Sequence, residues 1–194
     1  TYVKRYGDAY AEKTKVGVGS RITLDMGELG KEDWTIIGLY DPVYVGGFNP
    51  HKHVDTIVRA HAALAAELGA HAPYLMLVGT TQGDVFHGDL GRIRAAIREA
   101  GTEPLIRWTG YLPDDELRQL HSGAHGLLLP TACEGFGLPA VEAAACGAPV
   151  IATTESPLPR LLAGGGIFIP PGDEAALLSA MRVMATNETD RRAM

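Results

Sequence analysis

The sequence predicts an α/β protein built on a doubly wound parallel sheet, and three observations favour this fold class. Short apolar runs alternate with stretches of helical spacing from about residue 43 to residue 184. The runs are apolar along their whole length, as in strands that helices cover on both faces. Glycine and proline stand at the segment ends, where turns are expected. Such alternation produces right-handed βαβ units in a parallel sheet.

Three strand–helix units are expected in the first half of this region. Residues 43–47 fit a strand, and a helix from about residue 53 ends at Gly69, a typical C-terminal cap. Residues 74–78 fit the second strand and residues 89–100 its helix. Residues 104–108 fit the third strand, and Pro113 with the acids after it opens the next helix. Proline needs no hydrogen-bond donor there, and the acids suit the positive end of a helix.

The second half continues the same order. Residues 126–129 fit a strand, residues 138–146 a helix closed by Gly147, and residues 149–152 a strand. The domain is completed by a short helix from Pro157, a strand at 166–169 and a helix from Asp173 to about Met184. Residues 1–40 fit a linker or N-terminal extension, with a helix at 2–15 and a strand at 34–39, and residues 41–194 fit one domain.

Composition excludes several classes of protein. Seventeen Lys and Arg against 23 Asp and Glu give a net charge of −6, which argues against a nucleic-acid partner. No run approaches the ~20 apolar residues that a membrane span needs, and no signal peptide is visible, so a cytoplasmic protein is expected. The start at Thr1 suggests a fragment. Cys133 and Cys146 form no Cys-x-x-Cys pair and are expected to be reduced thiols.

The segment 134–142 is the richest candidate for chemistry. Gly135 and Gly137 shape a turn that leads into a helix, and backbone N–H groups at such a turn form an anion site. Glu134 and Glu142 flank it, and carboxylates accept hydrogen bonds from sugar hydroxyls, so a phosphorylated ligand with hydroxyl groups fits. The alternative is a simple turn with Glu142 as a solvated helix acid.

A second loop, 46–52, also lies between a strand and a helix. Gly46 and Gly47 allow a ligand to approach the backbone, and Lys52 supplies a point charge for a phosphate. The loop is not a Walker loop, and no Gly-x-Gly-x-x-Gly follows any strand, which argues against NAD. The alternative is an ordinary turn with a surface lysine.

Other site chemistries find little support. His121 and His125 are four residues apart, but Gly123 lies between them and the pattern changes from helix to strand, so no metal site is expected. No Gly-x-Ser-x-Gly elbow is present, which argues against a serine hydrolase.

Several of these segments resemble glycosyltransferase family 4 in order and spacing. Residues 134–142 look like the E-x7-E motif of retaining glycosyltransferases, and the runs 109–124 and 142–152 are similar to the segments that flank it. Residues 45–52 resemble the family's phosphate-binding strand and turn, above all in mannosyltransferase-like members. The resemblance covers about residues 43–185.

The resemblance implies the C-terminal, Rossmann-like half of a GT-B fold, which binds a nucleotide-sugar donor. Glu134 would contact the donor sugar, Glu142 the ribose hydroxyls, and Lys52 the charge on the leaving diphosphate. Leu112 would line the base pocket. The other implied donor-binding residues, through backbone N–H groups or close approach, are Gly46, Gly47, Gly135, Phe136, Gly137 and Leu138.

The implied reaction is hexose transfer with retention of anomeric configuration and without a metal or other cofactor. The acceptor, a glycan or a lipid-linked sugar, would bind an N-terminal domain that this chain lacks. The chain alone would therefore bind nucleotide and transfer nothing. The resemblance also implies possible peripheral contact of the full enzyme with a membrane.

Two positions depart from the family pattern. Gly47 stands where the family usually has an arginine, and Arg160 stands where many members have glutamate. Gly47 supports an alternative, a non-catalytic nucleotide- or sugar-binding module on the same fold. An epimerase or phosphorylase on this fold would lack the glutamate spacing.

Overall fold

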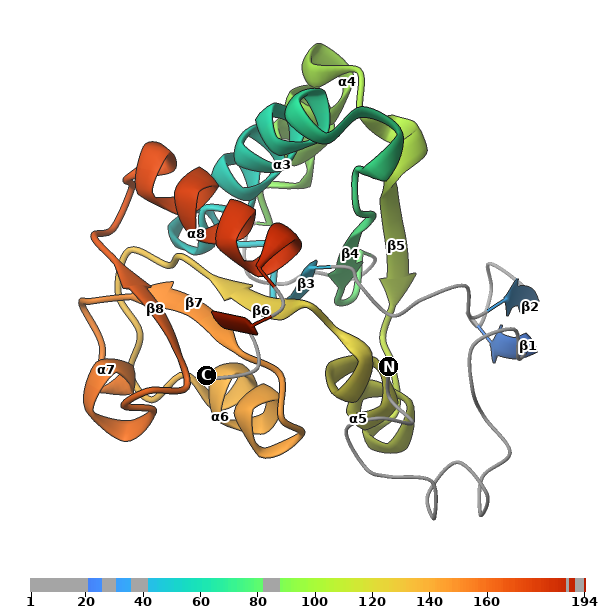
Figure 1. Cartoon of the computed structure of the whole chain (residues 1–194). Helices are drawn as coiled ribbons and strands as arrows, with labels where there is room; N and C mark the ends of the chain where they lie inside the picture. The colour runs from blue at the N-terminus through green and yellow to red at the C-terminus, as the bar shows by residue number, and fades with distance from the viewer. Residues whose placement is uncertain (1–20, 26–30, 36–41, 82–87, 188, 191–193) are drawn as a thin grey trace.

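The computed structural model describes residues 21–25, 31–35, 42–81, 88–187, 189–190 and 194 (Figure 1). The helix expected at 2–15 lies outside these residues, and so do residues 36–39 of the strand expected at 34–39. Before the main domain, strands β1 (Arg21–Asp25) and β2 (Lys31–Thr35) form an antiparallel pair. No strand was expected at 21–25, and β2 starts earlier than the strand expected at 34–39.

Six parallel strands form the main sheet. They are β3 (Pro42–Val45), β4 (Leu75–Val78), β5 (Ile106–Gly110), β6 (Gly126–Leu129), β7 (Val150–Thr153) and β8 (Gly166–Ile169). Their spatial order is β5-β4-β3-β6-β7-β8, and each neighbouring pair is parallel. This is the 3-2-1-4-5-6 order of a doubly wound sheet. The predicted fold class is confirmed.

Helices cover the sheet on both faces (Figure 1). One face carries α3 (Val54–Leu68), α4 (Leu90–Ala100) and α8 (Glu174–Thr186). The other carries α5 (Asp114–Gly123), α6 (Leu138–Ala145) and α7 (Leu158–Leu161). Short 3-10 turns occupy η2 (Pro50–Lys52), η3 (Gly69–His71) and η4 (Glu103–Leu105).

Side chains of the strands alternate between two apolar clusters because successive residues point to opposite faces. In β6, Leu128 packs with the cluster under α3, α4 and α8, whereas Leu127 and Leu129 pack with the cluster on the α6 face. All three leucines are buried. The continuous apolar run therefore reflects burial on both faces, as expected for a parallel sheet.

Element boundaries differ from the sequence expectation mainly around Pro104. The strand expected at 104–108 starts at Ile106, since Pro104 takes part in the 3-10 turn η4. Pro113 is the N-cap of α5 rather than its first residue. At the last helix, the Asp173 side chain caps α8 by accepting a hydrogen bond from Ala176 N at 2.8 Å.

The strand order of the sheet contains one switch point. β3 and β6 are neighbours, and the strand order runs in opposite directions from this pair. Ligands of doubly wound sheets bind beyond the carboxyl ends of the strands at such a switch point. The loops after β3 and β6 are the two richest loops of the sequence.

Candidate functional site

The loops after β3 and β6 meet at the switch point. The first covers residues 46–53 and the second residues 130–137. They are joined by a backbone hydrogen bond, in which Ala132 N donates to His51 O at 2.8 Å. The two segments that sequence analysis singled out are therefore parts of one site.

The most telling contact of this site is an ion pair between Lys52 and Glu134. Lys52 Nζ donates to both carboxylate oxygens, at 2.9 Å to Oε1 and 3.0 Å to Oε2. Their side chains are 19% and 11% exposed, so the pair is more protected from solvent than a surface salt bridge. The structure thus brings together the two residues predicted to act on the leaving group and the donor sugar.

The local chain path explains where Lys52 sits. The turn η2 is closed by Lys52 N, which donates to Asn49 O at 2.9 Å. His53 then takes a left-handed conformation, φ 52 and ψ 38, and caps α3. This sharp reversal places Lys52 just before the helix, on the side that faces the loop after β6.

Gly137 shapes the other loop. It is the N-cap of α6 with φ +76, and a Cβ at this position would lie 2.7 Å from Leu158 Cδ1. Both the backbone and the packing therefore require glycine here. Glu134 N donates to Glu155 O at 3.3 Å, which ties the start of the loop to the segment after β7.

The remaining predicted site residues differ in exposure. Phe136 and Leu138 are large apolar side chains that are 51% and 60% exposed, beside the start of α6. Glu142 lies further along α6 and is exposed, and Gly135 has open space around it. Leu112 is the exception, because its side chain is buried in the apolar cluster on the α6 face. Its place in a base pocket stays a prediction.

The loop after β4 packs directly against the glycine turn. Gly46 N donates to Val78 O at 3.1 Å. A Cβ on Gly79 would lie 2.3 Å from Gly46 O, so only glycine allows this approach. Gly46 itself has φ +144, in the region that favours glycine, whereas Gly47 has no such requirement.

Sequence reasoning missed one buried polar residue at this site. Tyr44 is fully buried in β3, and its hydroxyl donates a hydrogen bond to Gly47 O. Burial and the negative charge of Glu134 raise the pKa of Tyr44 well above its usual range. In the sequence Tyr44 belongs to an apolar run, so only the unusual need of a buried hydroxyl for a partner could have drawn attention to it.

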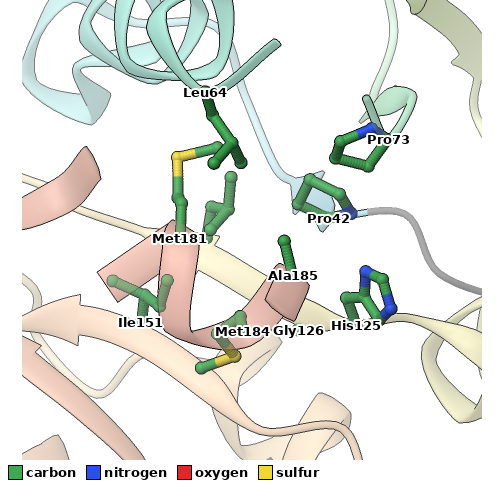
Figure 2. A pocket seen from close by; sticks show the side chains of 10 residues that line it. Pro42, Leu64, Pro73, His125, Gly126, Ile151, Met181, Met184 and Ala185 are labelled. Carbon is green, nitrogen blue, oxygen red and sulfur yellow. The ribbon is translucent and has the colours of Figure 1, made fainter. Parts of the chain in front are cut away.

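A small cavity lies at the opposite edge of the sheet (Figure 2). Pro42 and Gly126, which begin β3 and β6, line it together with Met181 and Met184 of α8. Its volume of about 10 Å³ corresponds to about one water-sized sphere, too little for a nucleotide. This cavity is separate from the site at the carboxyl edge.

Neither a metal cluster nor a membrane-spanning helix is present within the described residues. No group of three or more His, Cys, Asp or Glu side chains there is arranged to hold a metal ion. Among the helices of the same residues, none is both long and apolar enough to cross a membrane.

The sequence pattern of the family described as "Glycosyl transferases group 1" matches residues 41–187. The chain belongs to this family. Among its curated relatives, the O-antigen chain mannosyltransferase B of Escherichia coli is 32% identical over 136 residues, which are 70% of this chain and 34% of that protein. The D-inositol 3-phosphate glycosyltransferase of Corynebacterium jeikeium is 28% identical over 153 residues, 78% of this chain and 36% of that protein.

Solved structures show the same fold. The sucrose-phosphate synthase of Thermosynechococcus elongatus superposes with a TM-score of 0.71 at 24% identity, over 96% of this chain and 48% of that chain. Anabaena Alr3699/HepE in complex with UDP gives a TM-score of 0.68 at 19% identity, over 80% of this chain and 41% of that chain. The group 1 chain thus has the Rossmann-like fold of one half of a GT-B glycosyltransferase, and it spans only about a third of the length of these curated relatives.

Proposed function

We propose that this group 1 chain is the donor-binding domain of a retaining glycosyltransferase that moves a hexose from a nucleotide-diphosphate sugar to a glycan or lipid-linked acceptor. The observation that carries the proposal is the Lys52–Glu134 ion pair across the switch point. It puts a cation and a carboxylate side by side where doubly wound sheets bind nucleotides. The cation can stabilise a leaving diphosphate, and the carboxylate can accept a hydrogen bond from a sugar hydroxyl.

The start of α6 supplies the other half of the proposed site. Its N-terminus is a region of positive potential, and Gly137 turns the chain into it without a side chain of its own. Residues 135–138 would offer N–H groups to the diphosphate, and Glu142 would hold the ribose. Lys52 and this helix end would stabilise the developing charge, so we propose that no metal is required.

Mannose is the favoured sugar. The E. coli relatives are named as mannosyltransferases, and the turn 46–52 has the look of mannosyltransferase-like members. HepE binds UDP in its crystal structure, so the base is left to experiment. The acceptor and any membrane contact would belong to the rest of the enzyme.

Calorimetric titration of the chain with GDP, UDP and ADP, without added metal, tests the proposal. We expect one diphosphate to bind clearly, which would support a donor domain and name the base. Binding of none, by a chain shown to be folded, would contradict the donor-binding role. The non-catalytic alternative predicts binding by the chain but no transfer by the full-length enzyme.

The ribose role of Glu142 has its own test. We expect Glu142→Ala to weaken binding of the preferred diphosphate by about 1–3 kcal/mol, because charge-assisted hydrogen bonds are lost. Glu99→Ala, at an exposed acid of α4, is the matched control and should bind as the parent does. Equal affinity of the two variants would remove Glu142 from the ribose site.

A further inference from the structure

Tyr44 lies directly beneath the glycine turn of the proposed site. Its hydroxyl donates to Gly47 O, and a Cβ on Gly46 would lie only 3.3 Å from the Tyr44 hydroxyl oxygen. The hydroxyl therefore binds Gly47 directly and leaves little space for a side chain at Gly46.

The aromatic packing keeps the Tyr44 ring in place. Phe48 is fully buried and packs on Tyr44 with ring centroids 5.8 Å apart and on Trp108 at 5.2 Å. Phe48 O in turn accepts a hydrogen bond from Asp89 N at 2.7 Å. The peptide between Gly47 and Phe48 is therefore held on both sides, by the Tyr44 hydroxyl and by the buried Phe48 ring.

The direction of that peptide follows from its geometry. The described residues contain no cis peptide bond, and in a trans peptide the C=O and N–H groups point in opposite directions. Because Gly47 O points to Tyr44 in the core, the N–H of Phe48 points away from it. Gly47 is exposed, so the N–H side of this peptide faces the solvent at the carboxyl ends of the strands.

We propose that Tyr44 is a positioning residue that aims the Phe48 N–H at a phosphate of the donor, through its hydrogen bond to Gly47 O. This inference rests on the proposed function and adds a backbone donor and its support to it. The N–H would act beside Lys52, four residues on, so one phosphate group would receive a charged and a neutral donor. Tyr44 does not touch the ligand.

The chemistry of Tyr44 suits this task. Burial and, to a smaller extent, the nearby Glu134 charge raise the pKa of the phenol, so the hydroxyl stays protonated and keeps donating at neutral pH. Loss of the hydroxyl would leave Gly47 O without its buried donor, and the peptide, then held only on the Phe48 side, could rotate. Rotation would redirect the Phe48 N–H while leaving both side chains in place.

The test compares Tyr44→Phe with the parent chain by calorimetry, using GDP and UDP and the nucleosides guanosine and uridine. We expect the variant to bind the preferred diphosphate about tenfold more weakly and the nucleoside unchanged, since only the phosphate contact is affected. Tyr74→Phe is the control, because it removes a hydroxyl just before β4, from a ring that stacks on Arg107. It should change neither affinity.

A second variant removes the proposed donor itself. An ester in place of the Gly47–Phe48 amide deletes the N–H and keeps every side chain, and it should weaken diphosphate binding to a similar extent. Unchanged diphosphate affinity of either variant, or equal loss for diphosphate and nucleoside, would overturn the inference while the parent's binding upholds the donor-binding role. Absence of diphosphate binding by the folded parent would overturn both.

Discussion

At the scale of single residues, His53 holds a backbone conformation that its side chain makes costly. Its φ of 52 is the only positive value at a non-glycine position among the described residues, and left-handed geometry costs an L-residue about 1–2 kcal/mol. His53 also caps α3 without a side-chain hydrogen bond. Asparagine adopts this left-handed conformation more readily, because its short polar side chain can hydrogen-bond locally.

We therefore expect His53→Asn to raise the free energy of unfolding by about 1 kcal/mol. Urea denaturation followed by circular dichroism measures the change. The matched control is His51→Asn, at an exposed position of η2 with no left-handed backbone, which should leave stability unchanged. Equal effects of the two changes would show that the gain does not come from the backbone of residue 53.

Gly47 is open to a side chain, unlike its neighbour. A Cβ there would meet only the Asn49 side chain at ordinary distance, 3.8 Å, and the backbone is not in the left-handed region. We expect Gly47→Arg to fold normally and to bind the preferred diphosphate about tenfold more tightly, through a charge-assisted contact. Calorimetry of the variant measures this.

The control for Gly47→Arg is Gly46→Arg. Its φ of +144 and its closeness to the Tyr44 hydroxyl should make any side chain destabilising. Weaker or unchanged diphosphate binding by a folded Gly47→Arg variant would show that the guanidinium does not reach the phosphates.

At the scale of elements, one buried carboxylate connects three helices. Asp55 of α3 accepts from Arg59 at 2.8 Å and from Arg92 of α4 at 2.7 Å, and Arg59 also donates to Glu174 of α8 at 2.8 Å. Burial alone would raise the pKa of Asp55. The hydrogen bonds and the positive charges of the two arginines outweigh this effect, so the pKa is lowered. The network fixes the helix that follows Lys52.

We expect Asp55→Asn to destabilise the fold by about 1–3 kcal/mol, since the arginines lose a charged partner. Because the pKa of Asp55 is lowered by folding, its contribution is present above the usual carboxyl pKa and is lost as the pH falls through the folded value. Urea denaturation near neutral pH measures the difference, with Glu99→Gln as an exposed control. If Asp55→Asn lowers the free energy of unfolding no more than Glu99→Gln does, the network does not contribute to stability.

The elements also show what pattern alone can predict. The strands at 126–129 and 166–169 have the expected bounds, because their apolar runs are fully bracketed by glycine, proline or polar turns. The third strand starts two residues late, since Pro104 favours a 3-10 turn that an apolar pattern does not reveal. The pair β1–β2 was missed because its residues mix charged and apolar types without clear alternation.

At the scale of the whole molecule, buried histidines set the response to acid. Burial lowers the pKa of His121 to about 4, and burial also lowers the pKa of His61, although a hydrogen bond with Pro73 O opposes this. Both imidazoles are therefore neutral in the folded state. The unfolded chain takes up these protons first, so stability falls as the pH drops below about 6.5 toward the folded values.

From His121 alone, the loss between about pH 7 and pH 5 is about 2 kcal/mol. Urea denaturation at both pH values measures it. His121→Gln removes the titrating group and should reduce the pH dependence by most of this amount, whatever its own effect on stability at neutral pH. An unchanged dependence would show that folding does not lower the pKa of His121.

The candidate site is formed by residues that are far apart in the sequence and that only the complete fold brings together. Lys52 and Glu134 are 82 residues apart, and each could be singled out from its own loop, but their direct pairing could not. The pairing depends on β3 and β6 being neighbours, which follows from the strand order and not from either motif. The burial of Leu112 and the role of Tyr44 likewise depend on contacts distant in sequence.

The Lys52–Glu134 ion pair affects how strongly the site would bind a diphosphate. Glu134 pairs with the Lys52 ammonium group, which a diphosphate would also bind, so the carboxylate competes with the ligand for this cation. We expect Glu134→Gln to bind a nucleoside diphosphate more tightly than the parent, by calorimetry, and to gain less with a sugar nucleotide, whose sugar needs the carboxylate. Weaker diphosphate binding by Glu134→Gln would contradict this. The Lys52–Glu134 contact would then lower the affinity of the site for the nucleoside diphosphate that remains after transfer and so favour product release.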